Sequence, residues 1–69
     1  MPFVRIAIVR EVLQSDPEGK KAAISAKVAG AIADATGLPE HEVSIVFEEV
    51  EARNWYVGRT DVATMRFKT

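Results

Sequence analysis

The residue with the clearest chemical potential in this chain is Pro2. Once Met1 is removed, the Pro2 nitrogen becomes a secondary amine at the N-terminus. An α-amino group has a pKa of about 7.7 to 8.0, and an apolar pocket lowers it, so a neutral amine is available near pH 7 as a general base. A second interpretation is purely structural, because a proline after methionine permits trimming and can begin an edge strand.

Other residues suited to catalysis are few. The chain has no cysteine and a single histidine, His41, so the sequence predicts no disulfide and no metal site. His41 lies between Glu40 and Glu42 and is expected to be exposed. Glu48 and Glu49 point to opposite faces of a predicted strand, which favours a solvated strand end over an acid–base pair.

Two runs rich in β-branched residues, 3–10 and 43–50, predict the strands that position Pro2. Alternation gives each strand two faces, and Arg5 makes one face of the first strand half-buried, as expected of a surface covered by another subunit. The predicted faces are Val4, Ile6 and Ile8 against Phe3, Ala7 and Val9, and Val43, Ile45 and Phe47 against Ser44, Val46 and Glu48.

A helix is predicted to begin near residue 16. Its start is either a capping box of Ser15 and Glu18, or an Asp16 cap followed by Pro17 in the first helical position. Apolar residues then recur at helical spacing until Gly37, which is a stop signal.

The predicted fold class is α/β (α+β), a β-α-β subunit with a C-terminal hairpin in a single domain spanning 1–69. A crossover through a helix makes the two strands parallel, and such a crossover is right-handed. The stretch 61–67 after Gly58 alternates loosely and predicts a hairpin or edge strand. Two parallel strands and one helix do not form a self-sufficient sheet, so we expect a second subunit to complete it.

Composition favours self-association over other partners. With 9 basic and 10 acidic residues and a net charge of −1, the chain has no basic stripe for nucleic acid and no polybasic membrane patch. No segment approaches the roughly 20 apolar residues of a membrane span, and no signal peptide is visible, so the expected location is cytoplasmic. A chain this short buries only about 60% of its unfolded surface, and oligomerisation is the remaining source of stability.

These features occur in a recognisable order. After the proline and first strand come a Ser-led loop into a Lys-containing amphipathic helix, the sequence TGLP at 36–39, a second strand ending Glu-Glu-Val, and NWYVG at 54–58. In this order and spacing the chain resembles the 4-oxalocrotonate tautomerase family over essentially its whole length. The resemblance implies a β-α-β subunit with a terminal hairpin that forms dimers, which assemble into a hexamer.

The resemblance also implies a reaction and its residues. Pro2 would move a proton on an enol or dienol next to a carboxylate, with no metal or organic cofactor. Trp55 falls where the family places an aromatic residue near the proline, and there it would keep the amine neutral. The alternative role for Trp55 is packing in a subunit interface.

The chain departs from the family at its two substrate-binding arginines. The loop after the first strand lacks the family's Gly-Arg pair, and Ser44 occupies the position of the second arginine, whose positive charge a hydroxyl cannot supply. Arg10, Arg53 and Arg59 are possible substitutes. Arg10 is preferred because it ends the strand that Pro2 begins, although only the Arg10 of a neighbouring subunit could approach Pro2.

The function expected from the sequence is a cofactor-independent isomerase for small enol or dienol carboxylic acids. Pro2 is the expected base, and the substrate-binding candidates are Arg10, Arg59, Trp55 and Ser44. The missing arginines favour an alternative, a non-catalytic assembly subunit that partners an active paralogue. A third possibility is a module that binds a small ligand in the same pocket without turnover.

Overall fold

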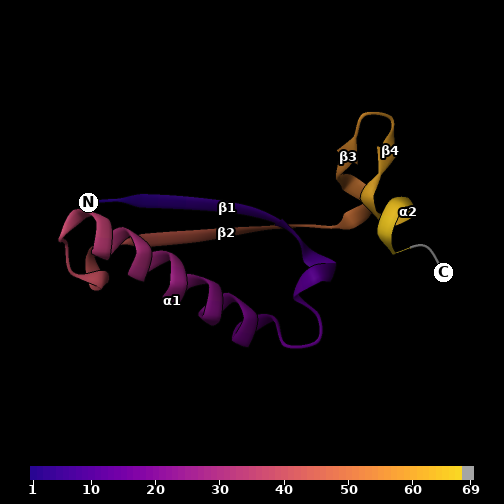
Figure 1. Ribbon diagram of the computed structural model, residues 1–69. Coiled ribbons are helices and arrows are strands. Elements are labelled where there is room, and N and C mark those ends of the chain that lie inside the picture. The colour runs from indigo at the N-terminus through magenta and orange to yellow at the C-terminus, as the bar shows by residue number, and fades with distance from the viewer. Residues whose placement is uncertain (68–69) are drawn as a thin grey trace.

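Two long parallel strands and one long helix make up most of the subunit. The computed structural model describes residues 1–67, in which β1 (Phe3–Val9) lies beside β2 (Ser44–Val50). The register pairs Phe3 with Ser44 and Val9 with Val50, so the two strands begin and end together. Helix α1 (Pro17–Thr36) connects them and lies along one face of this sheet (Figure 1). The predicted β-α-β unit is confirmed.

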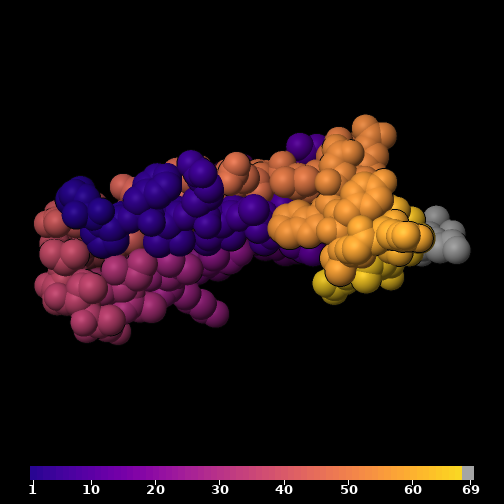
Figure 2. All heavy atoms as spheres, turned by 90° about the horizontal axis from the view of Figure 1, so that it is seen from above, coloured from indigo at the N-terminus to yellow at the C-terminus, as the bar shows by residue number. Residues whose placement is uncertain are grey.

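Alternation along both strands sorts side chains between the helix and the open face. The side chains toward α1 are half-buried, whereas those on the other face are exposed. Figure 2 shows this open face, on which the side chains of β1 are uncovered along much of the length of the molecule. The half-buried set includes Val4, Ile6, Ile8, Ile45 and Phe47, and the exposed set is Phe3, Arg5, Ala7, Ser44, Val46 and Glu48.

Local signals fix both ends of α1. Asp16 is the N-cap, its carboxylate accepts a hydrogen bond from the Gly19 amide at 3.1 Å, and Pro17 occupies the first helical position. The structure therefore selects Asp16 rather than the Ser15 capping box. At the other end Gly37 adopts the left-handed conformation at φ 82°, and its amide donates to the Ala33 carbonyl at 2.8 Å.

The chain after β2 forms a small unit at the far end of the sheet. A 3-10 turn, η3 (Ala52–Asn54), leads into a hairpin of β3 (Tyr56–Val57) and β4 (Thr60–Asp61), and then into a short helix, α2 (Val62–Arg66). The predicted hairpin is confirmed, but an edge strand over 61–67 is wrong beyond Asp61. The Asp61 carboxylate accepts hydrogen bonds from the amide and hydroxyl of Thr64, and this N-cap turns the chain into a helix.

The single subunit has little closed core. Among residues 1–67 the buried apolar side chains are Leu13, in the 3-10 turn η1 (Arg10–Leu13), Ala52 in η3 and Val62 in α2. No residue of α1 is buried, whereas Phe3 is 59% exposed and Tyr56 is 61% exposed. The remaining 3-10 turn, η2 (Glu40–Glu42), precedes β2. Within the described chain, no helix has the length and apolar character needed to cross a membrane.

The end of α1 yields a test of the fold. Gly37→Ala would place a β-carbon in the left-handed region, and we expect the free energy of unfolding to fall by about 1 to 2 kcal/mol. Gly30→Ala is the matched control, because a β-carbon there lies 3.7 Å from its nearest neighbour, an ordinary contact. In mid-helix this exchange should stabilise by about 0.5 to 1 kcal/mol. Chemical denaturation measures both, and equal effects would contradict the assigned helix end.

Candidate active site

Pro2 lies immediately before β1 in a half-buried position. Its carbonyl oxygen accepts a hydrogen bond from the Ser44 amide at 3.0 Å, which extends the pairing of the two strands by one step. The Ser44 side chain is exposed on the open face. The structure therefore brings together the backbones of two predicted site residues, Pro2 and Ser44, at the amino end of the sheet, while strand alternation places the Ser44 side chain and Pro2 on opposite faces.

Arg5 is a cation near this end that the sequence did not single out as a ligand. Its guanidinium carbon lies 5.9 Å from the centre of the Phe3 ring, within the range of a cation–π contact. Its Nε atom lies 3.5 Å from Glu48 on the paired strand. By strand alternation Arg5 shares the face of Phe3, whereas Pro2 shares the face of Val4. The Arg5 side chain therefore lies on the open face and not on the face of Pro2 in its own subunit.

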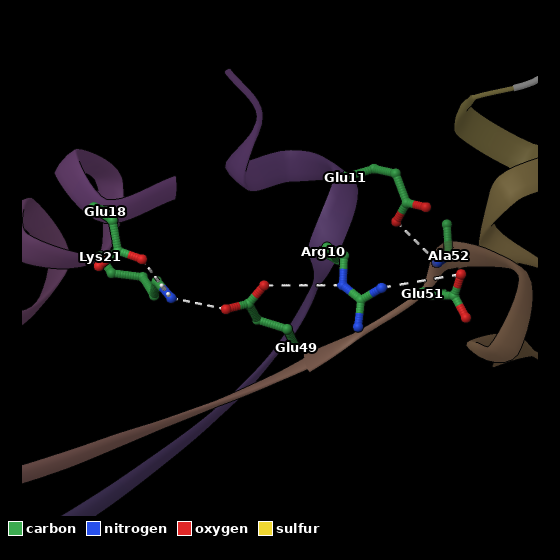
Figure 3. A network of polar contacts seen from close by, with 7 residues as sticks. All are labelled: Arg10, Glu11, Glu18, Lys21, Glu49, Glu51 and Ala52. Atoms are coloured by element: carbon green, nitrogen blue, oxygen red, sulfur yellow. Dashed lines mark hydrogen bonds and ion pairs between the residues drawn. The ribbon is translucent and has the colours of Figure 1, made fainter. Parts of the chain in front are cut away.

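Arg10 lies at the opposite end of β1, within a chain of charges. Its guanidinium is 3.9 Å from the Glu49 carboxylate and 4.0 Å from the Glu51 carboxylate. Glu49 also accepts a hydrogen bond from the Lys21 ammonium at 2.8 Å, and Lys21 lies 3.6 Å from Glu18 (Figure 3). Two basic and three acidic groups thus join α1 to the carboxyl ends of both strands. In this subunit Arg10 is engaged with protein carboxylates.

The sequence prediction for Glu48 and Glu49 is confirmed in one respect and wrong in another. Their side chains alternate between the two faces, but Glu49 is half-buried and paired rather than solvated. The hydrogen bond from Lys21 holds the pKa of the Glu49 carboxyl below its ordinary value and raises the pKa of Lys21. The stabilisation linked to the lowered carboxyl pKa is present above its unfolded-state value and is lost as the pH falls through the folded-state value.

Trp55 follows η3 and is half-buried. Its amide donates to the Ala52 carbonyl at 3.2 Å, and its own carbonyl accepts from the Val62 amide at 2.8 Å. The Trp55 backbone is therefore held on both sides. This placement at the junction between η3 and the hairpin suits either predicted role, as an active-site wall or as an interface residue.

The remaining candidate cations differ in their partners. Arg59 is exposed in the tight turn between β3 and β4, beside Gly58, which has φ 64°. Within residues 1–67 no carboxylate lies at ion-pair distance from Arg59. Arg53, in contrast, lies 3.5 Å from Glu51. Arg59 and Arg66 are the cations at this end that have no ion pair among the described residues, and of the two only Arg59 is a predicted site residue.

The candidate residues occupy opposite ends of the subunit. Pro2 and Ser44 lie at the amino end of the parallel strands, whereas Arg10, Trp55 and Arg59 lie at or beyond the carboxyl end. Seven residues of β1 separate these ends, a span of about 23 Å at roughly 3.3 Å per residue. One subunit therefore does not bring Pro2 together with the aromatic and cationic candidates.

A shallow groove lies at the amino end of the sheet, between α1 and the segment that leads into β2. Its lining includes Ser25, Glu40 and His41, and none of the predicted site residues. His41 is exposed in η2, as the sequence predicts. Among the residues that the structure describes, no group of acidic or histidine side chains could hold a metal ion. Val43 and Ile45 also line the groove, so it lies at the same end of the sheet as Pro2, although Pro2 itself does not line it.

Comparisons with known proteins agree with this architecture. The family model described as "Tautomerase enzyme" matches residues 2–65, so the match begins at Pro2. A protein of Bacillus cereus named "Probable tautomerase" is 31% identical over 58 residues, which cover 84% of this chain and 88% of the relative.

Two solved structures share the fold over nearly their whole length. A 4-oxalocrotonate tautomerase isozyme from Methylibium petroleiphilum has a TM-score of 0.79 at 26% identity, with 94% of this chain and 98% of the other covered. A heterohexameric 4-oxalocrotonate tautomerase from Chloroflexus aurantiacus J-10-fl has a TM-score of 0.78 at 27% identity, with coverages of 96% and 100%. With a family match that spans most of its length and this shared β-α-β subunit, the chain belongs to the tautomerase family.

Proposed function

We propose that this protein is a cofactor-independent tautomerase of small enol or dienol carboxylic acids, with Pro2 as its general base. The observation that carries the proposal is the position of Pro2, half-buried at the start of β1 and at the first residue of the family match. The neutral amine takes a proton from the enol and returns one to carbon. No net oxidation, group transfer or external reactant is involved.

The setting of Pro2 supports its use as a base once Met1 is removed. Met1 is 88% exposed, so the peptide bond that must be cut lies at an accessible end of the chain. Strand alternation places Pro2 on the same face as Val4 and Ile6, which are half-buried beneath the sheet. Partial removal from water disfavours the charged amine and lowers its pKa, which keeps the base neutral near pH 7.

The separation of the candidate residues supports a shared site. A second copy laid antiparallel along the first would bring its Trp55 and Arg59 toward Pro2, which one subunit cannot do alone. The same arrangement covers exposed apolar side chains, including Phe3, Val46 and Tyr56. We therefore propose a dimer as the unit that forms the site, and a hexamer made of three such dimers as the full assembly.

We assign the substrate carboxylate to Arg59 rather than to Arg10. Arg10 lies 3.9 Å from Glu49 and 4.0 Å from Glu51, so two protein carboxylates already offset part of its charge. Arg59 has no ion pair among the described residues. It lies in the turn between β3 and β4, a hairpin that projects away from the parallel sheet (Figure 1). The Ser44 hydroxyl is exposed on the open face, opposite to the face of Pro2, so we assign it no substrate contact at Pro2 of its own subunit. With both family arginines missing, a monocarboxylate substrate suits the site better than a dicarboxylate, because it needs fewer cations.

A non-catalytic assembly subunit is the second candidate function. Ser44 in place of a cation and the engagement of Arg10 favour it, because both weaken substrate binding. The solved Chloroflexus enzyme is a heterohexamer, so this fold supports mixed assemblies. A small-ligand binding module would instead show saturable binding without turnover. Turnover separates the proposed enzyme from both alternatives.

Removing the proposed base tests the mechanism at Pro2. On protein whose intact mass confirms loss of Met1, we expect ketonisation of phenylenolpyruvate or 2-hydroxymuconate above the solvent rate. The rate should rise with pH through one group below about pH 8, because the neutral amine is the active form. Pro2→Ala should lower kcat by about 100-fold or more, as expected for loss of a positioned base.

Pro39→Ala is the matched control for this prediction. Pro39 precedes η2 at an exposed position outside the proposed site, so its exchange should leave kcat near the wild-type value. A Pro2→Ala variant as active as Pro39→Ala would exclude the proline mechanism. No turnover by the wild type would favour the assembly subunit.

Arginine variants test which residue binds the substrate carboxylate. Arg59→Ala should raise KM for a carboxylate substrate by about tenfold or more, because one charge-assisted hydrogen bond is worth roughly 1.5 to 3 kcal/mol. Arg53→Ala is the control from the same end of the subunit, where Glu51 already engages the cation. If Arg10→Ala raises KM and Arg59→Ala does not, the carboxylate contact belongs to Arg10.

A charge introduced on the open face of the sheet tests whether this face is a subunit interface. Val46 is 41% exposed on the open face and is paired with Arg5, so Val46→Lys places a second cation at the centre of that face. We expect a smaller species by sedimentation velocity and loss of turnover at the same protein concentration. Ala31→Lys adds the same charge on the exposed side of α1 and should sediment as the wild type does. Unchanged sedimentation of Val46→Lys would show that the open face is not an interface.

A further inference from the structure

Glu11 makes one of the longest-range side-chain contacts in the subunit. Its Oε1 atom accepts a hydrogen bond from the amide of Ala52 at 2.9 Å, across 41 residues of sequence (Figure 3). Ala52 is completely buried, at 0% exposure. A buried amide without a partner costs roughly 1 to 3 kcal/mol, so Glu11 supplies an acceptor that water cannot easily replace. The bond joins η1, after β1, to η3, after β2.

A short series of hydrogen bonds continues from this contact to Trp55. The Ala52 amide donates to Glu11, while the Ala52 carbonyl accepts from the Trp55 amide at 3.2 Å. The Asn54 amide donates to the Glu51 carbonyl at 2.8 Å and closes the turn. The position and direction of Trp55 therefore depend on where Ala52 is held.

Neighbouring charges hold the same two segments together more weakly. Arg10, the residue before Glu11, approaches Glu51, the residue before Ala52, at 4.0 Å. Arg10 is about half-exposed, and an ion pair of this kind contributes little in water. The Glu11 bond is shorter, and its donor is buried. Glu11 is thus the more specific of the two contacts that fix η3.

We propose that Glu11 is a positioning residue that sets the placement of Trp55 in the active site. It acts through Ala52 and does not touch the substrate. The proposal has two parts. The mechanical part, that Glu11 fixes the position of Trp55, rests on the contacts within this subunit. The catalytic part rests on the proposed function, in which Trp55 of one copy covers Pro2 of another.

The consequence for catalysis follows from what Trp55 does to the amine. A well-placed indole excludes water from the neutral Pro2 nitrogen and lowers its pKa. If Trp55 loses its fixed place, water reaches the amine and its pKa moves back toward the ordinary α-amino range. More of the base is then protonated near pH 7, and the rise of the pH–rate profile moves to higher pH.

The mechanical part can be tested without any substrate. Trp55 is the only tryptophan in the chain, so its fluorescence reports on this position alone. Glu11→Ala should shift the emission to longer wavelength and increase quenching by acrylamide in the assembled protein. Glu11→Gln keeps an amide oxygen that can accept the Ala52 bond, and it should retain the wild-type emission. Glu40→Ala removes a carboxylate that has no ion pair or hydrogen bond among the described residues, and serves as the control.

The catalytic part is tested with the same variants. Glu11→Ala should lower kcat at pH 7 by about fivefold, the factor that corresponds to one net hydrogen bond, with little change in KM. Its pH–rate profile should rise at higher pH, and Glu11→Gln should restore the wild-type profile. A role in stability alone would lower the unfolding midpoint and leave the pH profile in place.

The outcomes separate this inference from the proposed function. Wild-type emission, quenching and pH profile in Glu11→Ala would overturn the positioning role while leaving the result for Pro2→Ala unaffected. If the wild type has no turnover, changed emission in Glu11→Ala still supports the mechanical link, and only the catalytic part fails. Should Glu11→Ala not fold, Glu11→Asp is measured instead, because it keeps the charge and is one methylene too short to make the bond. Wild-type emission in that variant would equally overturn the role.

Discussion

Two strands and one helix cannot enclose a core of their own, and this geometric constraint shapes the rest of the structure. A helix covers one face of a sheet, and the second face needs another layer. In this subunit the second face carries Phe3 and Val46 in exposed positions, while α1 has no fully buried residue. The most buried side chains, Leu13, Ala52 and Val62, lie instead in the turns and short helix beyond the ends of the strands. In the proposed dimer, the docking of another copy would both cover the sheet and complete the site.

Polar contacts join the segments at the carboxyl end of the sheet, where the most buried side chains also lie. Ion pairs connect the first turns of the helix with the ends of both strands, through Lys21, Glu49, Arg10 and Glu51. Glu11 adds a hydrogen bond to a buried amide, where an unmatched group would be most costly. These contacts hold in register the two segments that lead away from the sheet, including the one that carries Trp55. The loop that departs from the family pattern at Arg10 and Glu11 thus has a structural use in this chain.

Much of this fold could be predicted from local patterns. Runs of β-branched residues identified both strands, alternation gave their faces, and two local capping patterns both placed the start of the helix near residue 16, because these signals act between near neighbours in sequence. The short helix α2 could not be predicted in the same way. Its residues alternate loosely, and the deciding signal is the cap formed by Asp61 and Thr64. The contacts of Lys21 with Glu49 and of Glu11 with Ala52 cross 28 and 41 residues, and no local periodicity predicts such pairs. Sequence identified Pro2 by its chemistry, while the structure shows how far it lies from Trp55 within one subunit.

The hydrogen bond between the Pro2 carbonyl and the Ser44 amide has a consequence for how this end of the molecule can change. The Pro2 nitrogen belongs to the main chain, and its ring removes the torsion about the bond to Cα. No side-chain rotamers have to be frozen to place it, so ordering this atom carries almost no side-chain entropy cost. Its location is set by strand pairing, and a slip of one residue would move it by about 3.3 Å and reverse the face on which it lies. Reshaping this corner of the protein is therefore a problem of backbone register, which exchanging single side chains does not solve.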